Sequence, residues 1–414
     1  MQVVSLLLVL GACTVLSIPL GSQLPRPRIG YVRPADSNTV ASLFGSEEEA
    51  QKVKELLAAR SSSVEKELVN GGEAPNSRKK RRANPEENAG LGEYLYQGDI
   101  LLTPQQTSEL DESKTSRRRR SFVTNIPSRI WDINTPISWR FMATYDAQYA
   151  QMIRDGFKFW SDNSCLTFQV GTIQHEIAHA LGMDHAQSRS DRNQFITIYP
   201  EKINKALIGN FDLLKPEENN NFGVEYDYGS VLHYPDDAFA VVPGETTMVA
   251  ANKFYKKTMG QRLRASMSDI KLVNIFYNCA QKCPTKPACQ NGGIVNPKKC
   301  DSCICPPMFT GPLCSDPHKG RGVDAGKPTC SVTVQAAPGH SKVQLRFKEV
   351  TDYCDKTCSW QAVEVFVRGY DKSGYIFCCP EDHNGETFTA DASAVIRMWS
   401  RFSWNTFTVE YRSL

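Results

Sequence analysis

The segment from His175 to His185 places three histidines at a spacing that strongly limits how the surrounding chain can fold. His175 and His179 are four residues apart, so on a helix their imidazoles lie on one face, one turn apart. Gly182 follows where a left-handed residue would end that helix and turn the chain back toward the rings, which returns His185 to them. The spacing therefore predicts that three imidazoles hold one metal ion.

Glu176 follows the first histidine, where it cannot ligate the same ion but can hydrogen-bond a metal-bound water and accept its proton. Three neutral imidazoles with an open fourth position are typical of catalytic zinc. A buried helix can show the five-residue core by chance, whereas the extended His-Glu-x-x-His-x-x-Gly-x-x-His pattern is far more specific. We predict one Zn²⁺ per chain, bound by His175, His179 and His185, with Glu176 as general base.

Residues 1–17 form an apolar run that ends in small residues and is too short to span a bilayer. They predict a secretory signal peptide, with a buried N-terminal strand as the alternative. Secretion leads to an oxidising compartment, which suits the 13 of 14 cysteines that lie beyond this run. Since no later segment reaches membrane-spanning length, we expect a secreted, extracellular protein without a membrane span.

The net charge of +3 depends on two basic runs, Arg78–Arg82 and Arg117–Arg120, which hold nine of the 48 basic residues. Without them, 39 basic residues face 45 acidic ones, a net charge of −6. Basic runs with polar flanks are typical of solvated, protease-accessible linkers rather than of a binding face. We therefore expect no nucleic-acid partner, and we expect processing after Arg120.

Residues 18–120 are polar and predict a pro-segment with one amphipathic helix around Glu47 to Val69. Compact sequence follows, with strands expected at Ile137–Met142 and Cys165–Val170 and a helix at Ala147–Ser161. The expected core face of that helix consists of Met152, Ile153, Phe157 and Trp160.

Residues 283–314 carry six cysteines, more than a hydrophobic core of this size would explain. The closeness of Cys303 to Cys305 and the absence of histidine favour a disulfide knot over a second zinc site, although spacing leaves the connectivity open. Residues 330–414 alternate apolar and polar positions and predict a small β-sandwich. Its five cysteines are odd in number, so one is free or pairs elsewhere.

Several motifs together resemble the astacin family of zinc endopeptidases. Besides the histidine pattern, they are Gln187–Arg192, Tyr226–Tyr234, Gly260-Gln261, Ser268–Ile270 and Tyr277–Cys279. The resemblance covers residues 127–279 with one gap. It implies a zincin-type domain in which Tyr234 is a further ligand that swings to stabilise the tetrahedral intermediate, and in which Cys165 pairs with Cys279.

The resemblance extends to the pro-segment and to the C-terminal modules. Tyr96–Asp99 is similar to the family's latency motif, which implies that Asp99 ligates the zinc in the latent form only; a surface turn is the alternative. Residues 280–315 resemble an EGF-like module, which implies that its first cysteine pairs with the third, the second with the fourth, and the fifth with the sixth. Residues 316–414 resemble a CUB domain, without a matching calcium site. This order is similar to the nematode-like modular form of the family.

The chain departs from the family pattern most clearly between Cys165 and His175, which only nine residues separate. The family has a few dozen more there, including the sheet edge that aligns an extended substrate and a cysteine pair. One clean deletion would explain the loss of both. Smaller departures are Leu232 in place of the turn methionine, Asn193 at the end of the arginine-aspartate run, and Ala186 in place of the glutamate expected near a new N-terminal Ser121.

We therefore predict a multidomain α+β chain. Its parts are a signal peptide (1–17), a pro-segment (18–120), a zincin-type catalytic domain with a shortened N-terminal sheet (121–279), an EGF-like module (280–315) and a CUB-like β-sandwich (316–414). The expected function is a secreted, zymogen-derived zinc endopeptidase that hydrolyses extracellular proteins, with matrix or cell-surface partners for the last two modules. The alternatives are an extracellular binding protein with an inactive or incomplete peptidase domain, and an incomplete gene product.

Overall fold

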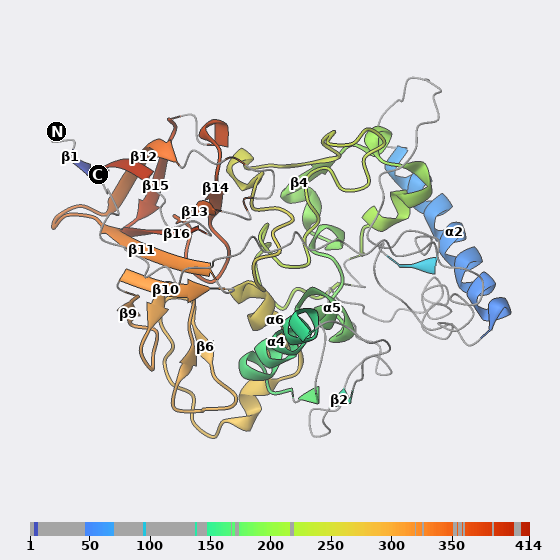
Figure 1. The fold of residues 1–414 in the computed structure, drawn as a ribbon, viewed down its shortest axis with the longest axis horizontal. Helices are drawn as coiled ribbons and strands as arrows, with labels where there is room; N and C mark the ends of the chain where they lie inside the picture. The colour runs from blue at the N-terminus through green and yellow to red at the C-terminus, as the bar shows by residue number, and fades with distance from the viewer. Residues whose placement is uncertain are drawn as a thin grey trace.

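The computed structural model describes three main regions of the chain and a helix that precedes them in the sequence (Figure 1). We call them the metal-motif region (147–282), the cysteine-rich region (283–318) and the C-terminal region (320–414). The described residues are 4–6, 46–69, 94–96, 137–138, 147–166, 168–169, 174–215, 219–318, 320–324, 327–350, 354, 358, 361–382, 385–400 and 407–414.

Helix α2 runs over Glu47–Val69, where the sequence predicts a helix. Its start is stabilised by three glutamates in the first turn and by the Ser46 hydroxyl, which accepts a hydrogen bond from Glu49 N at 3.1 Å. Ala50 and Val53 are buried. The helix packs against the 3₁₀ helices η6 (Pro200–Lys202) and η7 (Lys205–Phe211) of the metal-motif region.

The metal-motif region begins with helix α4, Ala147–Asn163, two residues longer than predicted at its C-terminal end. Ile153 and Trp160 of its expected core face are buried, and Phe157 packs against that core. The Trp160 indole donates to the carbonyl of Gln174 at 3.0 Å, so α4 supports the first residue of the next helix.

Two small strand pairs are described in and just before this region. Strands β2 (Ile137–Ser138) and β3 (Phe168–Gln169) form a parallel pair, and β4 (Ile196–Ile198) pairs with β5 (Met248–Ala250) in antiparallel fashion. The first two lie within the predicted strands, but Cys165 precedes β3 and is not part of it.

The region closes with helix α6, Met267–Phe276, which starts at a capping box formed by Ser266 and Asp269. Just beyond it, Cys279 forms a disulfide with Cys165 as the family resemblance implied, joining residues 114 positions apart.

The cysteine-rich region contains two small antiparallel pairs and three disulfides. Strand β6 (Ile294–Val295) pairs with β7 (Cys303–Ile304), and β8 (Phe309–Thr310) pairs with β9 (Asp316–Pro317). The disulfide pattern expected for this region is confirmed: the bonds are Cys283–Cys300, Cys289–Cys303 and Cys305–Cys314.

The C-terminal region consists of two antiparallel sheets whose inner faces share one buried cluster. One sheet has the order β10-β11-β16-β13-β14, and the other has the order β1-β17-β12-β15. The C-terminal strands are β10 (Gly320–Asp324), β11 (Lys327–Gln335), β12 (Lys342–Val350), β13 (Gln361–Phe366), β14 (Tyr375–Phe377), β15 (Thr387–Asp391), β16 (Ser393–Ser400) and β17 (Phe407–Ser413). Disulfides join Cys354 to Cys379 and Cys358 to Cys378, while Cys330 is buried and belongs to neither bond.

Strand β1 (Val4–Leu6) lies within the segment for which the sequence predicts a signal peptide, and it pairs with β17. Strand β17 also pairs with β12 on its other edge. Among the helices of the described ranges, none is both long and apolar enough to cross a bilayer.

The disulfide between Cys165 and Cys279 is expected to contribute most to stability because it closes the longest loop. Replacing both cysteines by alanine should lower the free energy of unfolding by about 2–5 kcal/mol, measured by urea denaturation. The same change at Cys305 and Cys314, which are only nine positions apart, should cost about 2 kcal/mol less because loop entropy grows with the logarithm of loop length. Equal losses would contradict this account.

Candidate metal centre

The helix that carries the first two histidines is α5, Gln174–Ala180. It ends as predicted, because Gly182 adopts a left-handed conformation with φ of 87°. The amides of Gly182 and Met183 donate to the carbonyls of His179 and Ala178 at 2.8 and 3.0 Å. This turn redirects the chain so that His185 comes back beside His175 and His179.

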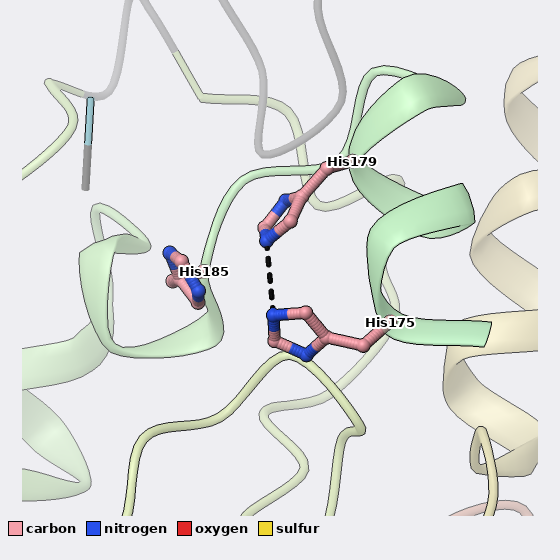
Figure 2. A group of neighbouring side chains, drawn as sticks. All are labelled: His175, His179 and His185. Carbon is pink, nitrogen blue, oxygen red and sulfur yellow. Dashed lines mark hydrogen bonds between the residues drawn. The ribbon is translucent and has the colours of Figure 1, made fainter. Parts of the chain in front are cut away.

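Figure 2 shows the three imidazoles around one point, His175 and His179 from α5 and His185 from the segment after the turn. The Nε2 atoms of His175 and His179 are 3.2 Å apart. The three rings offer one nitrogen each within 4.8 Å of one another. The structure thus brings together all three predicted histidine ligands.

Backbone carbonyls fix the tautomers of two of these rings. His175 Nδ1 lies 2.7 Å from the carbonyl oxygen of Val231, and His179 Nδ1 lies 2.7 Å from that of Met183. Since a carbonyl oxygen only accepts, each Nδ1 carries the proton and each Nε2 presents a lone pair. Two lone pairs that face each other at 3.2 Å repel unless a cation lies between them.

The spacing of these nitrogens fits zinc. Two nitrogens at 2.0–2.1 Å from a tetrahedral zinc ion are separated by about 3.3 Å, close to the 3.2 Å between the two Nε2 atoms. Imidazole is also a ligand that zinc prefers. The donor set therefore fits a zinc ion held by His175, His179 and His185.

Tyr234 lies beside this site. Its ring centroid is 4.4 Å from that of His185, and its side chain is buried between Phe211 and Phe239 at 5.7 and 5.3 Å. The Gln187 side chain accepts a hydrogen bond from Tyr234 N at 3.3 Å. The ring is therefore held next to the third histidine.

Glu176 occupies a different face of α5 from the buried His175, and its side chain is exposed. A carboxylate in contact with solvent beside the histidines can exchange protons with water. Asp99, Arg120 and Ser121 lie outside the described residues, as do the residues 97–98 of the predicted latency motif.

Two buried carboxylates hold the turn beneath the histidines. Asp269 accepts hydrogen bonds from Ser230 Oγ at 2.6 Å and from Val231 N at 2.9 Å. Asp227 accepts from Gly229 N at 2.9 Å. Because the Val231 carbonyl accepts the hydrogen bond from His175 Nδ1, these carboxylates position the first histidine through the backbone.

Burial sets the charge state of two groups in this turn. Burial, together with the nearby charge of Asp227, raises the pKa of Asp269 to about 6. Burial lowers the pKa of His233 to about 4, so its imidazole is neutral at pH 7. His233 Nδ1 donates to the Tyr234 carbonyl, and its Nε2 accepts from the Tyr226 hydroxyl, both at 2.7 Å.

Of the three residues that depart from the family pattern, Leu232 and Ala186 lie in the interior, while the Asn193 side chain accepts a hydrogen bond from Arg192 Nε at 3.1 Å. Leu232 is fully buried in the core below the metal motif, where a methionine was expected. Ala186 is also buried, and its amide donates to the Leu232 carbonyl at 3.2 Å.

Sequence reasoning missed the groups that orient the histidines. The carbonyls of Met183 and Val231 have no side-chain signature, so no residue pattern could have identified them. Asp227 and Asp269 lie in motifs that the family resemblance included, but only the fold shows that both are buried against one turn.

The chain is similar to known zinc proteases. Residues 169–278 match the family model Astacin (Peptidase family M12A). Zinc metalloproteinase dpy-31 of Caenorhabditis elegans is 34% identical over 330 residues, which cover 68% of this chain and 53% of that protein. Zinc metalloproteinase nas-28 of Caenorhabditis elegans is 27% identical over 404 residues, which cover 79% of this chain and 80% of that protein.

Among solved structures, the chain is similar to High choriolytic enzyme 1, a hatching enzyme zinc-protease from Oryzias latipes, with 24% identity. The match covers 38% of this chain and 94% of that one, with a TM-score of 0.32, too low to support an argument about shape. The chain spans about half the length of the dpy-31 protein it matches.

Asp269 should make stability depend on pH. Its folded pKa of about 6 lies above the ordinary 3.8, so the folded state binds the proton more tightly than the unfolded state. Protonated Asp269 therefore adds to the free energy of unfolding at low pH, and this stabilisation is lost as pH rises from about 4 to 6. The free energy of unfolding should fall by about 3 kcal/mol over this range. In urea unfolding of the zinc-free chain, Asp269→Asn should remove this decline. If the free energy of unfolding falls equally with pH in the wild type and in Asp269→Asn, Asp269 has no such role.

Proposed function

Since this chain belongs to the astacin family of zinc peptidases, as its motifs predicted, we propose that it is an endopeptidase that hydrolyses extracellular proteins. The observation that carries this proposal is the pair of Nε2 lone pairs that face each other at 3.2 Å, each fixed by a backbone carbonyl. Such a pair is unfavourable without a cation between the rings, and it is what a zinc site with two histidine ligands requires.

In the proposed mechanism, His175, His179 and His185 would hold the zinc ion, which would supply Lewis acidity at the scissile carbonyl. Glu176 takes a proton from the attacking water and delivers it to the leaving amine. Its exposed side chain can reach water and substrate. Tyr234, held beside His185, donates a hydrogen bond from its hydroxyl group to the developing oxyanion.

We also propose that the protein is secreted as a zymogen. The signal peptide would be residues 1–17, and Asp99 would occupy the fourth zinc position until cleavage after Arg120. The contact of α2 with η6 and η7 supports this reading, because it gives the pro-segment a second anchor on the metal-motif region. Loss of β1 with the signal peptide would leave β17 paired with β12.

The two C-terminal parts fit the proposed EGF-like module and CUB-like sandwich. The three disulfides of the cysteine-rich region have the expected pairing. The two antiparallel sheets of the C-terminal region enclose one core, as in a sandwich. Matrix or cell-surface proteins are the partners we propose for their outer faces.

Glu176→Gln tests the catalytic role, because the amide keeps the shape of the side chain but cannot accept the proton. Hydrolysis of unfolded casein by the chain cut after Arg120 should fall by about 10²–10⁴-fold, with one zinc per chain retained. Glu201→Gln, an exposed carboxylate on η6, should leave the rate unchanged.

Equal rates for the wild type and Glu176→Gln would remove the general base from the proposal. A wild type that holds one zinc and hydrolyses nothing would favour the alternative of an extracellular binding protein.

Activation is tested by expressing the full chain in cells that secrete it. The active protein in the medium should begin at Ser121, found by N-terminal sequencing, because the four arginines before it form an accessible cleavage site. Replacing all four arginines by glutamine should leave an uncut and inactive chain. An uncut chain with the activity of the cut one would overturn the zymogen proposal.

A further inference from the structure

We propose that the C-terminal region is a structural part of the metal centre, with Ser373 as a positioning residue for the turn that holds His175. The sequence predicts this region only as a module for outside partners. The inference rests on the proposed zinc function, and it assigns that site a support from more than 90 residues away in the sequence.

The first contact joins the loop before β14 to Asp227. The amide of Ser373 lies 3.2 Å from both carboxylate oxygens of Asp227, and the Ser373 hydroxyl lies 3.4 Å from one of them. Ser268 also donates to that carboxylate, which is buried. Asp227 would have fewer donors for its buried charge if Ser373 moved away, which costs free energy.

The second contact is a close approach at Gly229, in the same turn. A Cβ atom at Gly229 would lie 2.3 Å from Ser373 Oγ, 2.4 Å from Ser373 Cβ and 2.9 Å from Thr258 Cγ2. These distances are far below van der Waals contact, so only glycine lets the two regions pack this closely. Gly229 does not have a positive φ, so its absence of a side chain serves packing and not backbone conformation.

Thr258 joins the metal-motif region to the loop and strand around β14. Its hydroxyl donates to the Gly374 carbonyl and accepts from the Ile376 amide, both at 3.1 Å. Beside it, the ring of Tyr255 stacks on Tyr228 with centroids 4.3 Å apart and contacts Tyr375 at 4.6 Å. The turn, η8 (Lys253–Tyr255) and β14 therefore share one aromatic core.

A buried ion pair further fixes the two regions. Arg264 lies 3.0 Å from Glu364 of β13, and the glutamate is 2% exposed. Arg397 lies 3.9 Å from the same carboxylate, so Glu364 is held between a cation of each region, and separating the regions would leave this buried charge with fewer partners. Lys372 and Glu225 form another ion pair across the same boundary, at its solvent edge.

These contacts lead to the histidines by a short path. Ser373 contacts the turn at Asp227 and at Gly229. Two residues after Gly229, the Val231 carbonyl accepts the hydrogen bond from His175 Nδ1 at 2.7 Å. A shift of the turn would move this carbonyl away from His175. The ring would then lose the hydrogen bond that fixes its tautomer and its orientation. Groups that orient a metal ligand in this way typically change metal affinity by 10–100-fold when they are lost.

The test is a rescue experiment on zinc affinity, measured by competition with a chelator on the full chain. Gly229→Ala should weaken zinc binding about 10–100-fold, because its methyl group pushes Ser373 off the turn. Adding Ser373→Gly should recover most of the loss, since it removes the two closest atoms and keeps the backbone amide that donates to Asp227. Adding Ser341→Gly, an exposed site in the same region, should recover nothing.

Calorimetry of the zinc-free proteins supplies a second readout that does not depend on metal. In the wild type, the metal-motif and C-terminal regions should unfold together in one transition. The double variant Gly229→Ala with Ser373→Gly should behave in the same way. Gly229→Ala alone should show two transitions, because the two regions no longer pack together.

The inference is overturned if Gly229→Ala binds zinc like the wild type, or if Ser373→Gly and Ser341→Gly rescue it equally. A wild type that binds no zinc would refute the proposed function instead, and two transitions in that wild type would refute the inference as well.

Discussion

The structure of the metal centre depends on two hydrogen bonds in which imidazoles donate to backbone carbonyls. The bonds from His175 to Val231 and from His179 to Met183 put both protons on Nδ1 and leave both Nε2 lone pairs directed at one point. A site with this arrangement is preorganised for a cation, because the repulsion between the lone pairs is present before the ion arrives and is relieved by it. The third imidazole lies beside the same point, and the Tyr234 ring packs against it.

These hydrogen bonds require a backbone that does not move, and the molecule supplies it from several parts. The left-handed Gly182 fixes the Met183 carbonyl, and the Cys165–Cys279 disulfide joins the helices around it. The Val231 carbonyl lies in a turn held by two buried carboxylates, one of which contacts the C-terminal region. The stability of the whole chain is thereby linked to the geometry of one small site.

The sequence predicted the parts whose signal is local. Histidine spacing, the glycine after the zinc helix and the α2 helix each follow from residues within about thirty positions, whereas the cysteine-rich pairing was implied by the EGF-like resemblance and not by the spacing. It did not predict the docking of the C-terminal region, because Ser373 and Thr258 are common residues whose roles arise only when distant segments meet. The strand predicted from Cys165 began too early, because Cys165 and Leu166 follow directly on α4, where Cys165 forms the disulfide with Cys279.

The measurement that tests the central claim most directly is X-ray absorption at the zinc edge of the zinc-loaded, secreted chain. Three imidazoles in an open site predict about three nitrogen ligands at 2.0–2.1 Å, one further oxygen and no sulfur. Zinc–sulfur distances near 2.3 Å would instead place the metal on the cysteines and contradict the account.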